Sequence, residues 1–209
     1  ANCFHGRSFG TCCDGMRTIA ATMGTGVGSG IIINGNILRG IDGLAGEIGH
    51  TSVEPLGVPC GCGSFGCVEQ YTSATAIVRQ TIELMDKFPN SEIKDYSKLT
   101  SAIVYQAGKN GDELALEVFQ RMGFYLGICL STLINTFNPE VIVLGGGVVA
   151  GWDLFIPSVW KEILKRAYQV SAARVKVVPA LLGDDAGIVG AARLGFIEIN
   201  RSAKVQAHS

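Results

Sequence analysis

Several features of membrane, secreted and nucleic-acid-binding proteins are missing from this 209-residue sequence. No apolar run approaches the ~20 residues of a bilayer-spanning helix, and the N-terminus lacks the basic and then apolar pattern of a signal peptide. No run of Lys or Arg marks a nucleic-acid surface, since 17 basic and 18 acidic residues nearly balance. We therefore expect a cytoplasmic protein, with neither a membrane nor a nucleic acid as a partner.

The chain also lacks an initiator Met, because it begins Ala1-Asn2-Cys3, and we expect a fragment or a divergent gene product. With 47% hydrophobic residues it can build a real core, and its length predicts one or two domains. Seven Cys is an odd number, so without a secretory signal they fit thiols and metal ligands better than a disulfide framework. The 28 Gly, about twice the usual share, indicate tight loops that approach a ligand closely.

Residues 46–69, GEIGHTSVEPLGVPCGCGSFGCVE, concentrate metal-binding side chains among turn residues. Cys60, Cys62 and Cys67 form a C-x-C-x4-C pattern, and His50 lies ten positions before the first thiol. Zinc takes thiolate and imidazole ligands in fours, and four protein ligands leave no open position for chemistry. The pattern favours a structural zinc site. The alternative is stray thiols and a surface His, because short Cys-x-Cys pairs also occur without metal.

A glycine-rich segment, GTGVGSG at residues 24–30, predicts a turn between two strands. Residues 16–23 predict the first strand, and a β-branched triplet before Asn34-Gly35 predicts the second strand and a type I′ hairpin. A dinucleotide fingerprint would need a helix directly after the glycines, so we reject that interpretation. Two others stay open: a phosphate loop, in which backbone N–H groups and the Thr25 hydroxyl face phosphate oxygens, or a hairpin without a ligand.

The second half of the chain alternates helix and strand patterns. Apolar residues repeat every three or four positions from Ala115 to Phe137, as in a long buried helix, which Asn138-Pro139 ends. The apolar run at 141–144 predicts a parallel strand buried on both faces, with glycines directly after it, where ligands of open α/β sheets usually bind. The other predicted elements are helices at 73–88, 101–107, 152–168 and 186–196 and a strand at 175–179.

Three features, in this order, resemble the ROK family of sugar kinases and repressors, and within it the bacterial glucokinases. They are the Gly/Thr hairpin loop, the segment from Gly-Glu-x-x-Gly-His to C-x-C-G-x-x-G-C-x-E, and the strand end V-I-V-L-G-G-G. The likeness covers residues 16–196 and implies an α/β, actin-like or ribonuclease-H-like ATPase fold, whose C-terminal lobe this chain is similar to. Residues 1–15 would then be a remnant of the segment between the lobes, and residues 197–209 a polar tail.

The resemblance also implies which residues form the site. The ligands of a structural Zn²⁺ would be His50, Cys60, Cys62 and Cys67. The residues that hold sugar hydroxyls would be Glu47, His50 and Glu69. The residues that hold ATP, with Mg²⁺ on its phosphates, would be Gly24, Thr25, Gly26 and Gly28 on the phosphate side and Gly145, Gly146 and Gly147 on the adenosine side.

No residue of the chain is assigned a catalytic role. In the family, the general base is an Asp directly before an Ala-Asn pair, and Ala1-Asn2 looks like that pair, so the expected Asp would precede Ala1. The family's N-terminal Asp-x-Gly-Gly-Thr phosphate motif does not occur in the sequence either. We expect the chain as given to bind zinc but to turn over little or no sugar.

The resemblance implies ATP-dependent phosphorylation of a hexose, glucose to glucose 6-phosphate, by a homo-oligomeric glucokinase-type enzyme. Alternatives stay open within the same family. One is a kinase for N-acetylglucosamine, N-acetylmannosamine or fructose. Another is the sugar-sensing part of a ROK transcriptional repressor, which would carry a winged helix upstream, and a third is a catalytically silent paralogue.

Overall fold

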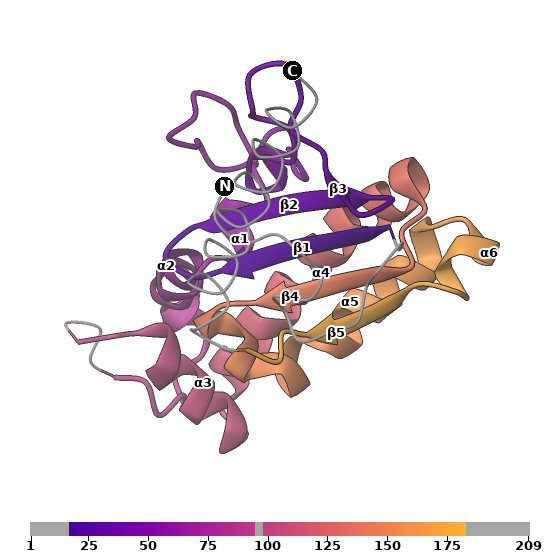
Figure 1. Ribbon diagram of the computed structural model, residues 1–209. Helices are drawn as coiled ribbons and strands as arrows, with labels where there is room; N and C mark the ends of the chain where they lie inside the picture. The colour runs from indigo at the N-terminus through magenta and orange to yellow at the C-terminus, as the bar shows by residue number, and fades with distance from the viewer. Residues whose placement is uncertain (1–16, 95–97, 183–209) are drawn as a thin grey trace, which may run out of the picture.

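Five strands form one mixed sheet (Figure 1). The computed structural model describes residues 17–94 and 98–182. The strands are β1 (Thr18–Met23), β2 (Val27–Ile33), β3 (Asn36–Ile37), β4 (Val141–Gly145) and β5 (Lys176–Pro179). Their order in the sheet is β3-β2-β1-β4-β5. Strand β2 is antiparallel to both β1 and β3, whereas β4 is parallel to both β1 and β5.

The first three strands form the meander that the sequence predicts. Asn34 and Gly35 connect β2 to β3, with φ angles of 52° and 75°. Two successive positive φ angles are what a type I′ turn requires, so the hairpin prediction is confirmed. The glycine-rich segment is followed by a strand, which agrees with the rejection of a dinucleotide fingerprint.

The glycine-rich turn is shorter than predicted. β2 begins at Val27, so only the residues from Gly24 to Gly26 connect the strands, and Gly28 pairs with Thr22 inside the sheet. The prediction of a turn over residues 24–30 is therefore wrong in its second half. Glycine can adopt the extended backbone of a strand at an entropic cost, and pairing along the whole of β1 outweighs that cost here.

Two long helices pack against one face of the sheet (Figure 1): α4 (Glu113–Phe137) and α5 (Trp152–Arg166). The Asp112 side chain caps α4 by accepting from the Ala115 N–H at 3.0 Å, and Asn138 ends the helix in the left-handed conformation. The predicted long helix and its end are confirmed. The core between these helices and the sheet includes the fully buried side chains of Ile19, Phe119, Met122, Leu130, Ile142, Leu144 and Phe155.

Shorter helices flank this core: α1 (Glu69–Thr72), α2 (Ala74–Leu84), α3 (Ser101–Lys109) and α6 (Gln169–Ala172). The Ser73 hydroxyl caps α2 by accepting from the Ala76 N–H, as the sequence predicts. A 3-10 turn, η3 (Met85–Lys87), replaces the last predicted turn of that helix. Among the residues described, no helix is both long and apolar enough to cross a bilayer.

The helix predicted at 152–168 is observed as α5, which ends two residues earlier than predicted. α5 ends at Arg166 because Ala167 takes an extended backbone, with ψ of 152°, and α6 follows. The Asn135 side chain of α4 accepts from the Tyr168 N–H at 2.8 Å and so competes for a group that a longer helix would use. The strand predicted at 175–179 is observed as β5, whereas the helix predicted at 186–196 and the segments 1–15 and 197–209 lie outside the described residues.

Small residues let α4 and α5 approach closely. A Cβ on Gly123 would lie 2.3 Å from the Phe155 carbonyl oxygen, and one on Gly127 would lie 2.7 Å from the Glu162 Cβ. One turn further on, the buried Ser131 hydroxyl donates to the Gly127 carbonyl at 2.6 Å. The glycines therefore set the distance between the two helices.

We expect Gly127→Ala to lower the free energy of unfolding by about 1–3 kcal/mol, because the added methyl forces the helices apart. This clash outweighs the gain in helix propensity, which is about 1 kcal/mol. Urea unfolding followed by circular dichroism measures the change, with Thr132→Ala on the exposed side of α4 as the matched control. Equal stability of Gly127→Ala and the unmodified chain would contradict the expectation.

Candidate functional site

The predicted metal loop, residues 46–69, folds back on itself. The 3-10 helix η2 (Ile48–His50) opens it, and an antiparallel bridge between Ser52 and Cys67 closes it. Gly66 makes the close crossing possible: its φ is 64°, and a Cβ there would lie 1.7 Å from the Glu54 carbonyl oxygen. The fold of the loop brings its distant ends to one point.

The four predicted metal ligands meet at that point. The ligand atoms of His50, Cys60, Cys62 and Cys67 all lie within 4.8 Å of one another. The Cys60 Sγ is 3.6 Å from the His50 Nδ1, and the Cys62 Sγ is 3.6 Å from the Cys67 Sγ. A tetrahedral zinc site with Zn–S bonds of about 2.3 Å would separate its sulfurs by about 3.8 Å. This donor set, in type and spacing, fits zinc.

The thiols of the cluster differ in their readiness to ionise. The backbone N–H of Cys62 donates to the Cys60 sulfur and, with the His50 side chain, lowers the pKa of Cys60 to about 6. Burial raises the pKa of Cys67 to about 12. A bound cation would reverse the preference of Cys67, because a positive charge stabilises the buried thiolate.

Glu69, the first residue of α1, connects the metal loop to the β1–β2 turn. Its Oε2 accepts from the Val27 N–H at 2.8 Å, and a Cβ on Gly26 would lie only 2.5 Å from the same oxygen. The absence of a side chain on Gly26 therefore lets the carboxylate rest against the turn. Two motifs more than forty residues apart meet in one contact.

Ser29 of β2 positions the start of the metal loop. Its hydroxyl donates to the Gly46 carbonyl and accepts from the Ile48 N–H at 3.0 Å. This pins η2 to the sheet, with the exposed Glu47 directly before it and the exposed His50 at its end. The predicted sugar-binding residues Glu47, His50 and Glu69 thus all lie on segments anchored to β2.

The predicted phosphate loop is a tight turn braced by α2. The Gly24 carbonyl accepts from the Ala74 N–H at 2.7 Å, and the Thr25 carbonyl accepts from the Thr75 hydroxyl at 3.0 Å. Within the described part of the chain, the N–H groups of Thr25 and Gly26 have no acceptor. Unpaired backbone N–H groups in a turn are the kind of donor that a phosphate oxygen accepts from.

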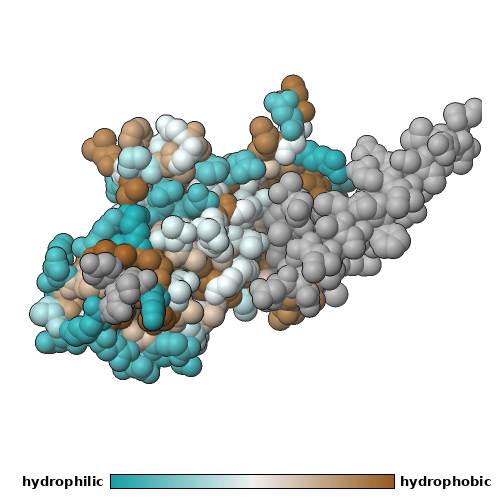
Figure 2. All heavy atoms as spheres, turned by 90° about the vertical axis from the view of Figure 1, so that its left-hand side faces the viewer, coloured by the Kyte–Doolittle hydropathy of each residue, from teal (hydrophilic) through white to brown (hydrophobic). Residues whose placement is uncertain are grey.

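The second glycine motif lies beside the first. Gly145 ends β4, and Gly146, with φ of 87°, packs so closely on β1 that a Cβ would lie 2.3 Å from the Met23 carbonyl oxygen. Since β1 and β4 are parallel, their carboxyl ends bring this motif and the Gly24 turn to the same edge of the sheet. Figure 2 shows this end of the molecule, where pale and hydrophilic side chains lie between separate brown areas.

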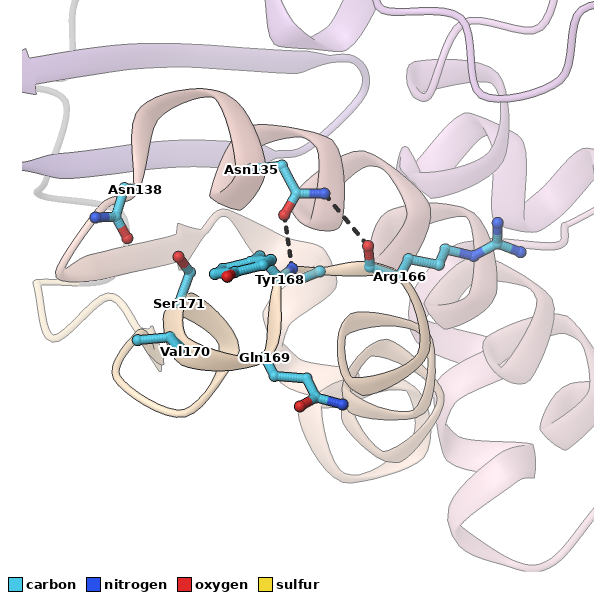
Figure 3. A pocket seen from close by; sticks show the side chains of 8 residues that line it. Asn135, Asn138, Arg166, Tyr168, Gln169, Val170 and Ser171 are labelled. Carbon is cyan, nitrogen blue, oxygen red and sulfur yellow. Dashed lines mark hydrogen bonds between the residues drawn. The ribbon is translucent and has the colours of Figure 1, made fainter.

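A cavity of about 960 Å³ lies elsewhere, where α4, α5 and α6 meet (Figure 3). There the Asn135 side chain accepts from the Tyr168 N–H and donates to the Arg166 carbonyl. The cavity lies beside the start of β4, at the opposite edge of the sheet from the glycine motifs. None of the sequence-predicted site residues lines it.

Sequence reasoning missed the groups that connect the motifs. The Ser29 and Thr75 hydroxyls form hydrogen bonds with backbone atoms of distant segments, and the Val27 N–H donates to Glu69. No sequence pattern indicates such contacts, because each one involves a backbone group that nearly every residue type shares. Gly28, predicted to lie in the phosphate loop, is instead part of β2, beyond the turn.

Comparisons with known proteins agree on one family. A model of the ROK family matches residues 7–196. The glucokinase of Halalkalibacterium halodurans is 41% identical over 183 residues, which are 85% of this chain and 56% of that protein. The DNA-binding transcriptional dual regulator NagC of Escherichia coli is 34% identical over 88% of this chain and 45% of that protein.

A solved structure shares the fold. The crystal structure of a ROK family glucokinase from Streptomyces griseus in complex with glucose and AMPPNP has a TM-score of 0.78 and 33% sequence identity. The match covers 88% of this chain and 61% of that one. The chain spans about half the length of the curated relatives it matches.

We expect Cys67→Ser to lose most of the one zinc ion bound per chain, because the site then keeps only three of its four strong ligands and water must fill the fourth position. Elemental analysis after dialysis measures the loss. Cys129→Ala is the matched control: Cys129 is buried in α4, where burial raises the pKa of its thiol to about 12, and it lies outside the cluster. Equal zinc in Cys67→Ser and the unmodified chain would refute the metal site.

Proposed function

The chain belongs to the ROK family, as its motifs predicted, and we propose that it forms the sugar- and nucleotide-binding part of an ATP-dependent hexose kinase whose acceptor is glucose. The identity to a glucokinase supports the kinase, and the related Streptomyces griseus structure, in complex with glucose and AMPPNP, supports both ligands.

One observation carries the proposal: the contact of Glu69 with the Gly24–Gly26 turn. Its Oε2 is held by the Val27 N–H next to Gly26. A sugar bound to the carboxylate would lie beside phosphates bound to the turn. Phosphoryl transfer depends mainly on holding acceptor and phosphate in line and close together, and this arrangement supplies that proximity.

The sugar would be held from one side by the metal loop. His50 has its Nδ1 at the Cys60 sulfur, so its Nε2 is the nitrogen that would reach a sugar oxygen. The Glu47 and Glu69 carboxylates would accept hydrogen bonds from sugar hydroxyls. Zinc, held by His50 and the three cysteines, would stabilise the loop and has no part in the reaction itself.

ATP would lie along the carboxyl edge of the sheet. Its phosphates would accept from the N–H groups of Thr25 and Gly26, and its adenosine side would approach the backbone at Gly145 to Gly147. Mg²⁺ would be carried mainly by the phosphates, as this ion usually keeps waters and few protein ligands.

A second function has support of its own, since the regulator NagC is 34% identical over 88% of this chain. The same sugar site would then serve as a sensor for a DNA-binding part of the protein. The higher identity to a glucokinase favours the kinase.

We expect the protein that contains this chain to phosphorylate glucose with a kcat/KM about ten-fold or more above that for N-acetylglucosamine, N-acetylmannosamine or fructose. A coupled assay of ADP formation across the four sugars measures the ratio. Another preferred sugar would correct the substrate. Absence of phosphorylation, together with DNA binding that a sugar modulates, would replace the kinase by the repressor.

We expect Glu69→Gln to weaken glucose binding by about ten- to a hundred-fold, because a hydrogen bond to a charged group is worth roughly 1.5–3 kcal/mol. The amide keeps an oxygen for the Val27 N–H, so the turn should persist. Calorimetric titration with glucose measures the effect. Glu113→Gln, an exposed carboxylate at the start of α4, is the control, and an unchanged affinity in Glu69→Gln would remove Glu69 from the sugar site.

A further inference from the structure

Gln70, the residue after Glu69, touches the metal cluster although it is not one of the four ligands. Its side-chain Nε2 donates to the Cys60 Sγ at 3.6 Å. The same sulfur lies 3.6 Å from the His50 Nδ1. The Cys60 sulfur is therefore contacted by the His50 ring and by an amide of α1, in addition to the backbone N–H of Cys62.

The backbone of Gln70 is fixed on both sides, which orients the side chain. Its N–H donates to the Cys67 carbonyl at 2.9 Å, and its carbonyl accepts from the Arg79 guanidinium at 2.5 Å. Arg79 in turn pairs with Glu83 at 2.6 Å on α2. The half-buried amide is thus directed at the sulfur from a residue with little freedom to move.

The donor matters because of the charge of the site. Three thiolates carry one more negative charge than Zn²⁺ neutralises, while a neutral imidazole adds none. An N–H that points at a thiolate offsets part of this excess and fixes the direction of the sulfur lone pairs. Removal of the donor should weaken the metal site without removal of any ligand.

We propose that Gln70 is a positioning residue of the metal centre: its amide holds the Cys60 thiolate and offsets its charge, which strengthens metal binding and keeps Glu69 in place on the same helical turn. This inference rests on the metal site of the proposed function. It assigns to Gln70 an electrostatic role that a packing residue would not have.

The test compares Gln70→Ala and Gln70→Glu with the unmodified 209-residue chain. Competition with a chromogenic chelator measures zinc affinity. We expect about a ten-fold loss in Gln70→Ala and a larger loss in Gln70→Glu, whose carboxylate would face the thiolate. Gln106→Ala, an exposed glutamine of α3, should bind zinc as the unmodified chain does.

Substitution of Co²⁺ for zinc gives an absorption spectrum whose charge-transfer band altered packing alone would not shift. A hydrogen bond lowers the energy of the sulfur lone pair, so its loss should shift the thiolate-to-Co²⁺ charge-transfer band to longer wavelength in both Gln70 variants. Circular dichroism of the metal-loaded proteins verifies the fold.

The outcomes separate this inference from the metal site itself. If Gln70→Glu binds zinc as tightly as the unmodified chain, or if both variants weaken equally with an unshifted cobalt band, the electrostatic role of Gln70 is overturned while the metal site stands. If the unmodified chain binds no more zinc than Cys67→Ser, the metal site fails and the inference fails with it.

Discussion

The contact between the Glu69 carboxylate and the Val27 N–H is the interaction on which the site depends. It joins the metal loop, which ends at Glu69, to the turn between β1 and β2. Gly26 makes it possible, because any side chain there would collide with the carboxylate oxygen. A protein that transfers a group between two ligands must hold both in one geometry, and this contact sets the distance between the two halves of the proposed site.

The rest of the fold keeps that contact in place. The close packing of α4 and α5 at Gly123 and Gly127 forms a rigid layer beneath the sheet, and the parallel pairing of β1 with β4 brings both glycine motifs to one edge. The turn is braced by α2, and η2 is pinned by Ser29. The residues that would touch ligands therefore sit on short segments tied to a packed core, which is how loops acquire defined geometry.

Much of this could be predicted from sequence where the signal is local. Asn34-Gly35 predicts its turn because few residues tolerate two positive φ angles, and the apolar repeat before Asn138 predicts α4. The end of β2 nearest the turn could not be predicted, because Gly28 has no preference between a strand and a loop. The break between α5 and α6 depends on Asn135, more than thirty residues away along the chain.

The four predicted metal ligands show what the sequence determines and what the tertiary structure adds. The sequence by itself determined the chemistry of the ligands: three thiols and an imidazole at spacings that one loop can close, and acids and glycines of the types that sugars and phosphates require. Only the tertiary structure decided that these groups meet, that Glu69 lies on the phosphate turn and that Gln70 faces Cys60. The reason is physical: side-chain chemistry belongs to each residue, whereas the contact of an oxygen with a backbone N–H forty-two residues away arises only when the chain between them has folded.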